Sequence, residues 1–430
     1  MKLVVYEDNR YDRLYPLTYM RPTFDLRCGQ TLLREKIERA VGRGADVLFV
    51  REWLRDLCTA RNPNTPVNDL AALKGDDLLI VNGRCLWLGG VEVPRNRDGC
   101  GVVGDEVAWI SLRRDTAAAI GGATFEEFVE TAARRVAKSD AKVKLISYPW
   151  DLVNENPAAV EDDFAKLGKR GIEGTFSSQA AIWGPKERLY VAPGAEVAPG
   201  AVVDTRHGPV IIEEGAVVNP LVRIQGPTYI GRNTLCFVAA RIHEGTSIGP
   251  VCYVGGEVEE AIIHGYANKV HDGFLGHAYV CPWVNLGAGT TNSDLKNDYG
   301  DVEVYVNGQL VNSHNLKVGC FIGDHTKTSI GTMINTGTVI GVASNLLGAG
   351  SLLPKFVPSF VLFMEGKFFK VGIKQQIETA HKAMGRRNTK MLPAEEALLR
   401  FLHEMTKEDR AEVLKRSRRQ VLAEKGLGQA

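Results

Sequence analysis

The sequence has few of the features that mark secreted, membrane-bound or zinc-binding proteins. Its eight cysteines form no CxxC pair, so neither a zinc ribbon nor a redox pair is indicated. No apolar run approaches the ~18 residues of a membrane-spanning helix. The opening stretch MKLVVYEDNRYDRL turns acidic too early for a secretory signal. We expect a cytoplasmic protein with reduced thiols and no membrane partner.

Net charge is also nearly absent. The chain has 52 Lys and Arg residues against 51 Asp and Glu residues, a formal net charge of +1. A dedicated nucleic-acid binder would normally be basic, so we expect no nucleic-acid partner. Small anionic ligands are still allowed, because they need only a local cluster of positive charge. The length of 430 residues is enough for two or three domains.

The first 150 residues alternate short apolar runs with helical patterns. The apolar runs predict buried strands at 2–6, 46–50 and 78–81, and helical spacing predicts helices at 31–41 and 125–137. Strands that alternate with helices indicate a parallel sheet covered by helices, a Rossmann-like α/β domain. We therefore place one domain at 1–150 and a connector with a short helix at 151–187.

A six-residue period dominates the chain from 188 to 369. In HDGFLGHAYVCPWVNLGAGTTNSDLKN, apolar residues recur six apart at Phe274, Val280 and Leu286, and similar hexads continue for about fifteen repeats. This period predicts a left-handed parallel β-helix, a triangular coil with one hexad on each face. Small residues, above all Gly, suit the corners because they tolerate a left-handed backbone.

The hexads break once, at 295–317, where VEVYV and GQLVN predict a β-hairpin that projects from the coil. Such an insertion is usually functional or in contact with a subunit. Residues 370–430 carry amphipathic helical patterns and form the last predicted segment.

Histidines gather in the predicted coil. Six of the nine lie between 243 and 325, and His is the natural base near pH 7 for moving an acyl group from a thioester to an amine. A surface or capping role is the competing interpretation for any one of them. A trimeric β-helix that holds zinc through histidines is a second alternative. Two of its ligands are five residues apart, and none of the neighbouring intervals among His243, His264, His271 and His277 that we compared is five.

The stretch GFLGHAYVCPWVNLGAGTTNSDLKNDYG resembles the acetyltransferase half of the GlmU family, bifunctional enzymes that make UDP-N-acetylglucosamine. The closer similarity is to an alternate, Bacteroidetes-type GlmU-like group, at 285–300 and 322–341. This resemblance implies that His271 is the general base and that Glu257 lies near the acetyl site. It implies that acetyl-CoA binds at Gly287, Ala288 and Gly289. It implies that the sugar and its phosphate bind at Arg241, Lys269, Asn285 and Asp294.

Two residues depart from that family pattern. Asp294 stands where the family has an asparagine beside the sugar, and Glu259 where it has a phosphate-binding lysine. Lys269 is a nearby candidate for the missing charge.

The stretch RLYPLTYMRP at 13–22 resembles the nucleotidyltransferase signature, which binds nucleotide phosphates with a Gly-rich loop. The resemblance implies nucleotide binding by Arg13, Thr18, Arg21 and Asn82. The glycine places of the signature are not glycines here. Arg84 follows Asn82-Gly83 where the family has a Mg²⁺-binding aspartate, and a guanidinium cannot ligate a cation. The metal ligands are therefore not identified.

Three interpretations of this domain stay open: an active transferase with rearranged ligands, a sugar-phosphate binding domain without catalysis, and a structural platform. For the whole chain we predict an enzyme of sugar-nucleotide synthesis. It would acetylate an amino sugar 1-phosphate, such as glucosamine-1-phosphate, from acetyl-CoA. It would also join the sugar phosphate to UTP or another NTP with Mg²⁺, and it would act as a homotrimer. The alternatives are a non-catalytic sugar-nucleotide scaffold and the metal-dependent lyase.

Overall fold

The structure is a computed structural model that describes residues 1–90, 96–348 and 350–424. Its contacts divide the chain into two compact units. The first unit comprises Met1–Leu14, Met20–Arg27 and Thr31–Tyr148. The second comprises Tyr15–Tyr19, Cys28–Gln30 and the chain from Pro149 onward.

The first unit is built on a mixed six-stranded sheet with the order β4-β1-β5-β8-β7-β9. Strand β1 is parallel to β4 and β5, whereas β8 is antiparallel to β5 and β7. The strands are β1 (Lys2–Tyr6), β4 (Val47–Phe49), β5 (Leu78–Asn82), β7 (Gly99–Val103), β8 (Glu106–Leu112) and β9 (Lys138–Asp140). The helices are α1 (Leu33–Val41), α2 (Arg55–Arg61), α3 (Arg114–Ala118) and α4 (Phe125–Arg135). The shorter strands are β2 (Arg27–Cys28), β3 (Thr31–Leu32), β6 (Cys85–Leu86) and β10 (Lys144–Leu145).

Helix α4 closes the core of this unit. Thr124 caps its first turn by accepting a hydrogen bond from the N–H of Glu127. Its first aromatic residue, Phe125, stacks on Phe49 at 3.7 Å between ring centroids and meets Tyr6 edge-on at 5.5 Å. The C-terminal ends of β1 and β4 therefore lie beside the start of α4.

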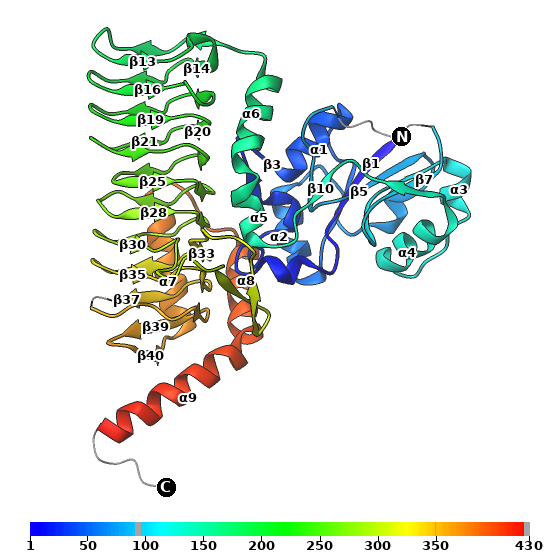
Figure 1. Ribbon diagram of the computed structural model, residues 1–430. Helices are drawn as coiled ribbons and strands as arrows, with labels where there is room; N and C mark the ends of the chain where they lie inside the picture. Colours follow the sequence, from blue (N-terminus) through cyan, green and yellow to red (C-terminus); the bar gives the residue numbers. More distant parts are fainter. Residues whose placement is uncertain (91–95, 349, 425–430) are drawn as a thin grey trace. The chain divides into compact units, whose positions relative to one another are not determined.

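The second unit contains a left-handed parallel β-helix, so the predicted fold class is confirmed (Figure 1). In-register partners lie 18 residues apart at Val210, Thr228 and Thr246, which is three hexads for each coil. Ten strands build the first face: β11 (Gly171–Ile172), β14 (Leu189–Val191), β17 (Val210–Ile212), β20 (Thr228–Ile230), β23 (Thr246–Ile248), β26 (Ile262–Ile263), β29 (Tyr279–Val280), β33 (Cys320–Ile322), β36 (Thr338–Ile340) and β38 (Phe356–Val357).

The other two faces are each interrupted once. The second face has β12 (Thr175–Phe176), β15 (Glu196–Val197), β18 (Val217–Val218), β21 (Leu235–Cys236), β24 (Tyr253–Val254), β27 (Asn268–Lys269), β34 (Lys327–Thr328), β37 (Asn345–Leu347), β39 (Val361–Met364) and β40 (Lys367–Lys370). The third face has β13 (Ala181–Trp183), β16 (Val202–Asp204), β19 (Arg223–Gln225), β22 (Arg241–Ile242), β25 (Glu257–Glu259), β28 (Phe274–Gly276), β30 (Thr291–Asn292) and β35 (Met333–Ile334). The first coil strands lie inside the expected connector 151–187.

One apolar residue of each hexad points into the prism and is fully buried, as at Val197, Val218 and Val254. Several corners hold a left-handed residue that is not Gly, for example Ala239 and Val251. Hydrogen bonds to the preceding coil support these corners: the N–H of Ala239 donates to Pro220 O and that of Val251 to Arg232 O. The ladder between coils therefore offsets the conformational cost that otherwise favours Gly.

Helices and one hairpin decorate the coils of this unit. Helix α5 (Pro149–Asn154) leads into α6 (Asn156–Leu167), which lies along the stack in Figure 1 and packs on the first face. The insertion forms an antiparallel hairpin, β31 (Glu303–Val306) and β32 (Gln309–Asn312). The chain continues through α7 (Ile373–Gly385), α8 (Pro393–Met405) and α9 (Lys407–Glu424).

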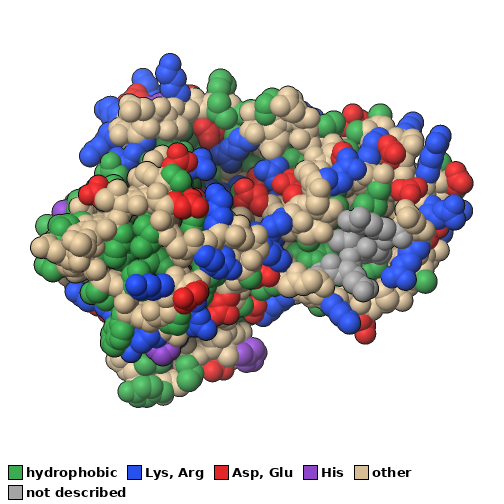
Figure 2. Space-filling model, turned by 90° about the horizontal axis from the view of Figure 1, so that it is seen from above, with side chains coloured by type: hydrophobic (Ala, Val, Ile, Leu, Met, Phe, Trp, Pro, Cys, Tyr) green, Lys and Arg blue, Asp and Glu red, His purple; other side chains and the backbone are tan. Residues whose placement is uncertain are grey.

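None of the helices in the described ranges is long and apolar enough to cross a membrane. Side chains of both charges are interspersed over the face shown in Figure 2, as the small net charge leads one to expect.

Candidate functional site

His271 lies at an exposed corner of the β-helix between the second and third faces. We call the stack of Gly255–Gly256, His271–Asp272 and Gly287–Gly289 on three successive coils the His271 corner. The coils touch there through backbone: the N–H of Gly289 donates to Asp272 O at 2.9 Å. A Cβ on Gly256 would lie 2.8 Å from His271 O. Small residues are therefore required for the coils to stack at this corner.

The predicted acetyl-CoA residues occupy the last layer of this corner. The N–H of Gly287 donates to Thr328 Oγ1 at 2.9 Å, and that of Gly289 is used by Asp272. In the part of the chain that the structure describes, no group accepts a hydrogen bond from the N–H of Ala288. The structure thus places the three residues beside His271, and one backbone donor among them has no partner within the chain.

Lys269 lies beneath the corner and not on the surface. The residue is 3% exposed, and its Nζ donates to Gly255 O at 2.9 Å and to His271 O at 3.0 Å. Burial lowers the pKa of Lys269 to about 8. Its ammonium group is therefore directed at two backbone carbonyls that hold the corner.

A charged group covers the third face on the coils next to His271. Arg241 of β22 is in register with Glu257 of β25, and its Nη2 lies 3.1 Å from Glu257 Oε2. His243, directly after the end of β22, places its Nε2 3.2 Å from Glu257 Oε1. Burial opposes ionisation of Glu257, but Arg241 and then His243 lower its pKa. His243 was considered from the sequence only for the zinc alternative. Its spacing of two residues from Arg241, which in an extended chain puts both side chains on the same side, could have indicated this position.

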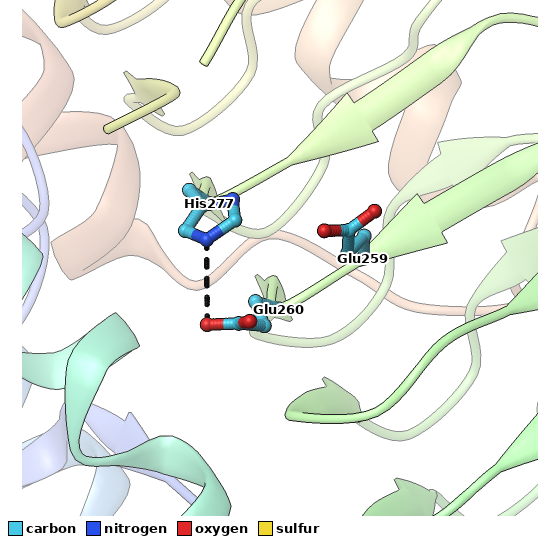
Figure 3. Close-up of side chains that lie close together, drawn as sticks. All are labelled: Glu259, Glu260 and His277. Carbon is cyan, nitrogen blue, oxygen red and sulfur yellow. Dashed lines mark ion pairs between the residues drawn. The ribbon is translucent and has the colours of Figure 1, made fainter. Parts of the chain in front are cut away.

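Asp294 takes part in a second, more buried group. Its Oδ2 lies 2.9 Å from Nδ1 of His277, and Glu260 Oε2 lies 3.3 Å from Nε2 of the same ring (Figure 3). Glu259, to one side of this pair in Figure 3, accepts a hydrogen bond from Lys317 Nζ at 3.2 Å. Burial alone would lower the pKa of His277, but Asp294 and Glu260 raise it to about 9. Glu260 and Lys317 were not predicted from the sequence as site members, and His277 was considered only for the zinc alternative.

The same group tests the zinc alternative. Glu259, Glu260 and His277 are the one set in the described residues whose ligand atoms are close enough for a metal ion. Both nitrogens of His277 face carboxylates, and Asp294 and Glu260 favour the protonated, charged form of the ring by raising its pKa. The arrangement is that of an ion-paired histidine.

In the first unit, a cavity of about 470 Å³ lies at the carboxyl ends of β1 and β5. Ligands of open α/β sheets commonly bind at this edge. The cavity is lined by Tyr6, Glu7, Asp8, Asn9, Arg10, Tyr11, Arg51, Glu52, Asn82, Glu106, Val107, Phe125, Glu126, Val129 and Glu130. In the sequence, the four polar residues Glu7–Arg10 directly follow the apolar run that forms β1, and this pattern could have indicated the cavity.

Arg84 underlies this cavity as a fully buried guanidinium. Its Nη2 lies 2.6 Å from Asp8 Oδ2 and also bonds Glu106. Burial disfavours the charged form, but the hydrogen bonds to Asp8 and Glu106 raise the pKa of Arg84 above its ordinary value. A second buried pair, Arg51 Nη1 with Glu7 Oε1 at 2.5 Å, lies beside it.

This network bears on the expected Mg²⁺. All four carboxylate oxygens of Asp8 and Glu106 accept hydrogen bonds from Arg10, Asn82 or Arg84. Mg²⁺ needs carboxylate oxygens that are open to coordination. These residues therefore do not fit a Mg²⁺ ion at this place.

Of the predicted nucleotide-binding residues, the structure brings only Asn82 to the cavity, where its Nδ2 donates to Asp8 Oδ2 at 2.9 Å. Arg13 lies 6.0 Å from the ring of Tyr148. Arg21 is buried, and its carbonyl accepts a hydrogen bond from Arg51 Nη2. Thr18 is buried within Tyr15–Tyr19, a segment assigned by its contacts to the second unit.

Comparisons with known proteins place these two sites in context. A family model described as "Sugar nucleotidyl transferase" matches residues 3–171. The chain is 33% identical over 115 residues to a bifunctional sugar-1-phosphate nucleotidylyltransferase/acetyltransferase of Sulfurisphaera tokodaii, a match that covers 27% of each chain. It is 27% identical over 227 residues to the bifunctional protein GlmU of Nitratidesulfovibrio vulgaris, which covers 47% of this chain and 45% of that protein. The matches thus span less than half the length of these relatives.

A solved UDP-N-acetylglucosamine acyltransferase from Francisella novicida is 14% identical with a TM-score of 0.29, and the match covers 56% of this chain and 91% of that one.

Proposed function

We propose that the second unit transfers an acetyl group from acetyl-CoA to the amine of an amino sugar 1-phosphate, with glucosamine-1-phosphate as the first candidate. The observation that carries this proposal is the hydrogen bond between Gly289 and Asp272. It joins the coil of His271 to the coil of the segment that resembles an acetyl-CoA site. A base and an acyl donor would then meet at one corner.

The chemistry follows from the groups at the His271 corner. The amine nitrogen attacks the thioester carbonyl carbon while the His271 imidazole takes the amine proton. The N–H of Ala288 is the candidate donor to the oxygen that becomes negative. The C–S bond then breaks, and the leaving thiolate receives the proton from the imidazolium.

The sugar phosphate is proposed to bind between Arg241 and Lys317 on the third face. These side chains are 54% and 45% exposed, and each is held by one carboxylate of β25, Arg241 by Glu257 and Lys317 by Glu259. Residues two apart on a strand project on the same side at about 6.7 Å. Lys317 thus supplies the charge that the family has at the position of Glu259, whereas Lys269 supports the corner from within.

The cavity of the first unit is proposed to bind the nucleotide. This unit would transfer a nucleotidyl group from UTP or another NTP to the sugar 1-phosphate and release pyrophosphate. We further propose that the protein belongs to the alternate GlmU-like subfamily. We also propose that it is a homotrimer and that it is located in the cytoplasm. A second candidate for this unit is binding without catalysis. The inner charges of the cavity favour it, because Arg51 and Arg84 are already paired with Glu7, Asp8 and Glu106.

The test is thiol release from acetyl-CoA with glucosamine-1-phosphate, comparing the wild type with His271→Ala. Loss of a general base is expected to lower the rate at least ~100-fold. His314→Ala is the matched control, because that side chain is 82% exposed in the insertion. Equal rates in the wild type and His271→Ala would refute the role of His271. No release from the folded wild type with any amino sugar phosphate would favour the scaffold alternative.

A further inference from the structure

A cavity of about 280 Å³ lies between the second face of the β-helix and helix α7, outside the His271 corner. We call it the α7 cavity. Its lining residues are Tyr266, Asn268, Trp283, Val284, Asn285, Lys327, Thr379, Lys382, Ala383, Arg386 and Arg387. Among these residues, only Asn285 was predicted from the sequence to bind a ligand, the sugar or its phosphate.

The lining is strongly cationic. It contains Lys327, Lys382, Arg386 and Arg387 and no carboxylate. In the described ranges of the chain, none of these four forms an ion pair. Lys382 lies in the last turn of α7, and Arg386 and Arg387 follow directly after the end of the helix. A bound anion would therefore be placed among three cations of one short segment and Lys327 of the β-helix.

Two of the cations are anchored so that they stay in the cavity. The guanidinium of Arg387 lies 3.8 Å from the ring centroid of Tyr253 and donates to Asn268 Oδ1, while its buried Nε has no hydrogen-bond partner in the described chain. Lys327 is held by a hydrogen bond from its Nζ to His325 O at 2.6 Å. Burial lowers the pKa of Lys327 to about 8, which a phosphate beside it would reverse.

An aromatic pair completes the wall. The rings of Tyr266 and Trp283 lie 4.7 Å apart at successive corners and border the same cavity. Aromatic faces of this kind stack nucleobases irrespective of base identity.

Asn285, in the wall of the α7 cavity, lies close in the chain to the His271 corner. Backbone bridges align Asn268, Asn285 and Lys327 in one column. Asn285 lies two residues before Gly287, whose N–H bonds Thr328, the neighbour of Lys327. An extended ligand with its thioester at Ala288 would reach the α7 cavity with its other end.

We propose that the α7 cavity binds the 3′-phosphorylated adenosine diphosphate half of CoA, with the phosphates on the four cations and the adenine against Tyr266 and Trp283. This inference rests on the proposed acetyl transfer for its ligand. It assigns to Lys382 of α7, and to Arg386 and Arg387 after its end, a part in determining which acyl donor is accepted. A donor without the nucleotide would bypass the cavity.

The experiment uses Lys382→Glu and Arg386→Glu, separately and together, in the full-length chain. Lys374→Glu is the matched control, because it makes the same charge change in the first turn of α7, outside the cavity. Affinity for adenosine 3′,5′-bisphosphate, measured by calorimetry, is expected to fall at least ~10-fold in each cavity variant and to stay unchanged in the control. Circular dichroism checks that each variant is folded.

Kinetics give the second readout. The KM for acetyl-CoA is expected to rise at least ~10-fold in the cavity variants, whereas the rate with acetyl-N-acetylcysteamine, which lacks the nucleotide, stays unchanged. If transfer occurs but KM and bisphosphate affinity match those of Lys374→Glu, the cavity proposal is wrong and the acetyl transfer stands. If no transfer occurs but the variants lose bisphosphate binding, the cavity stands and the proposed function fails. Wild-type protein that binds no bisphosphate would also overturn the cavity proposal.

Discussion

The ring of His277 lies between two carboxylates, which favour its charged form by raising its pKa. Its ring is 7% exposed, and each nitrogen faces a carboxylate, Asp294 on one side and Glu260 on the other. Its backbone is also left-handed, with φ of 48°, so the residue carries conformational strain that its partners offset. The ion pairs of His277 with Asp294 and Glu260 fix the chain between β28 and the insertion. The proposed sugar-binding residues lie near this part of the chain.

This pairing predicts a pH-dependent contribution of His277 to stability. The folded pKa of about 9 lies above the ordinary value of ~6.5. The stabilisation is therefore complete below pH ~6.5 and is lost as pH rises through about 9. His277→Gln is expected to lower the unfolding free energy by ~1–3 kcal/mol at pH 6 and by much less at pH 9.5. Denaturant unfolding at both pH values checks this, with His314→Gln as the exposed control. A penalty that is equal at the two pH values would contradict the ion pairing.

The ion pairs of Arg84 predict an effect of mutation on the stability of the first unit. Arg84→Met would leave Asp8 and Glu106 close together without their shared cation, and a broken buried pair costs ~3–5 kcal/mol. The added change Asp8→Asn is expected to recover part of that loss. Urea unfolding of the first unit measures both. Because the network needs no metal, EDTA is expected to leave the wild-type midpoint unchanged, and a shift with EDTA would mean that a divalent cation binds there after all.

The site could be predicted from the sequence only in part, and the missed residues have a common reason. His271 and Gly287–Gly289 lie in one uninterrupted motif, so their proximity follows from the hexad register. Lys317 is 58 residues from Glu259, and Arg84 is 76 from Asp8. Lys317 and Glu259 are separated by an irregular insertion, so the hexad period does not predict their contact. Arg84 and Asp8 follow different strands, and the order of those strands in the sheet could not be predicted from the sequence. Lys269 was predicted to be a charge available to the sugar phosphate. In the structure its side chain is buried, because its position in the hexad points into the β-helix.

At the scale of elements, the insertion at 295–317 does two things in the structure. The hairpin folds back on its own chain, where Tyr305 stacks on Phe356 at 4.1 Å. The return segment then brings Lys317 to β25. The hypothesis that the hairpin covers a neighbouring subunit stays a prediction, for which Leu310, 53% exposed, is a candidate contact.

The return segment predicts a selective binding defect. Lys317→Met is expected to raise the KM for glucosamine-1-phosphate at least ~10-fold with little change in kcat, because it removes a charge that serves substrate binding. Glucosamine without a phosphate should react equally with wild type and variant. Lys296→Met, in the same insertion and paired with Asp298, is the control. A fall in kcat with both acceptors would instead indicate that Lys317 acts on the corner.

Elements with a strict period were predicted well from the sequence, and those without one were not. Strands β1, β4 and β5 and helices α1 and α4 match the predicted runs because burial sets their pattern. The β7–β8 pair was missed, since Gly99–Val103 contains two glycines and no clear alternation. It turns the predicted parallel sheet into a mixed one.

At the scale of the whole molecule, exposed apolar residues follow the corner between the second and third faces. Leu221, Val238 and Ile330 are 64%, 59% and 70% exposed and lie on coils before and after His271. Large apolar side chains that recur in exposed positions along one edge suggest an interface, and the His271 corner lies between Val238 and Ile330 on this edge. A second chain seated on this column would also close the acyl-donor path beside Ala288.

The column predicts that assembly and acetyl transfer are lost together. We expect the wild type to sediment as a trimer of the 47.1 kDa chain, about 141 kDa. Ile330→Glu would put a charge into the apolar column. It is expected to dissociate the trimer and lower acetyl transfer at least ~100-fold, although His271 is intact. Ile172→Glu, at the first coil, is the control that should keep mass and activity. A fully active monomer of Ile330→Glu would show that one chain holds the complete site, and that the apolar column serves another purpose.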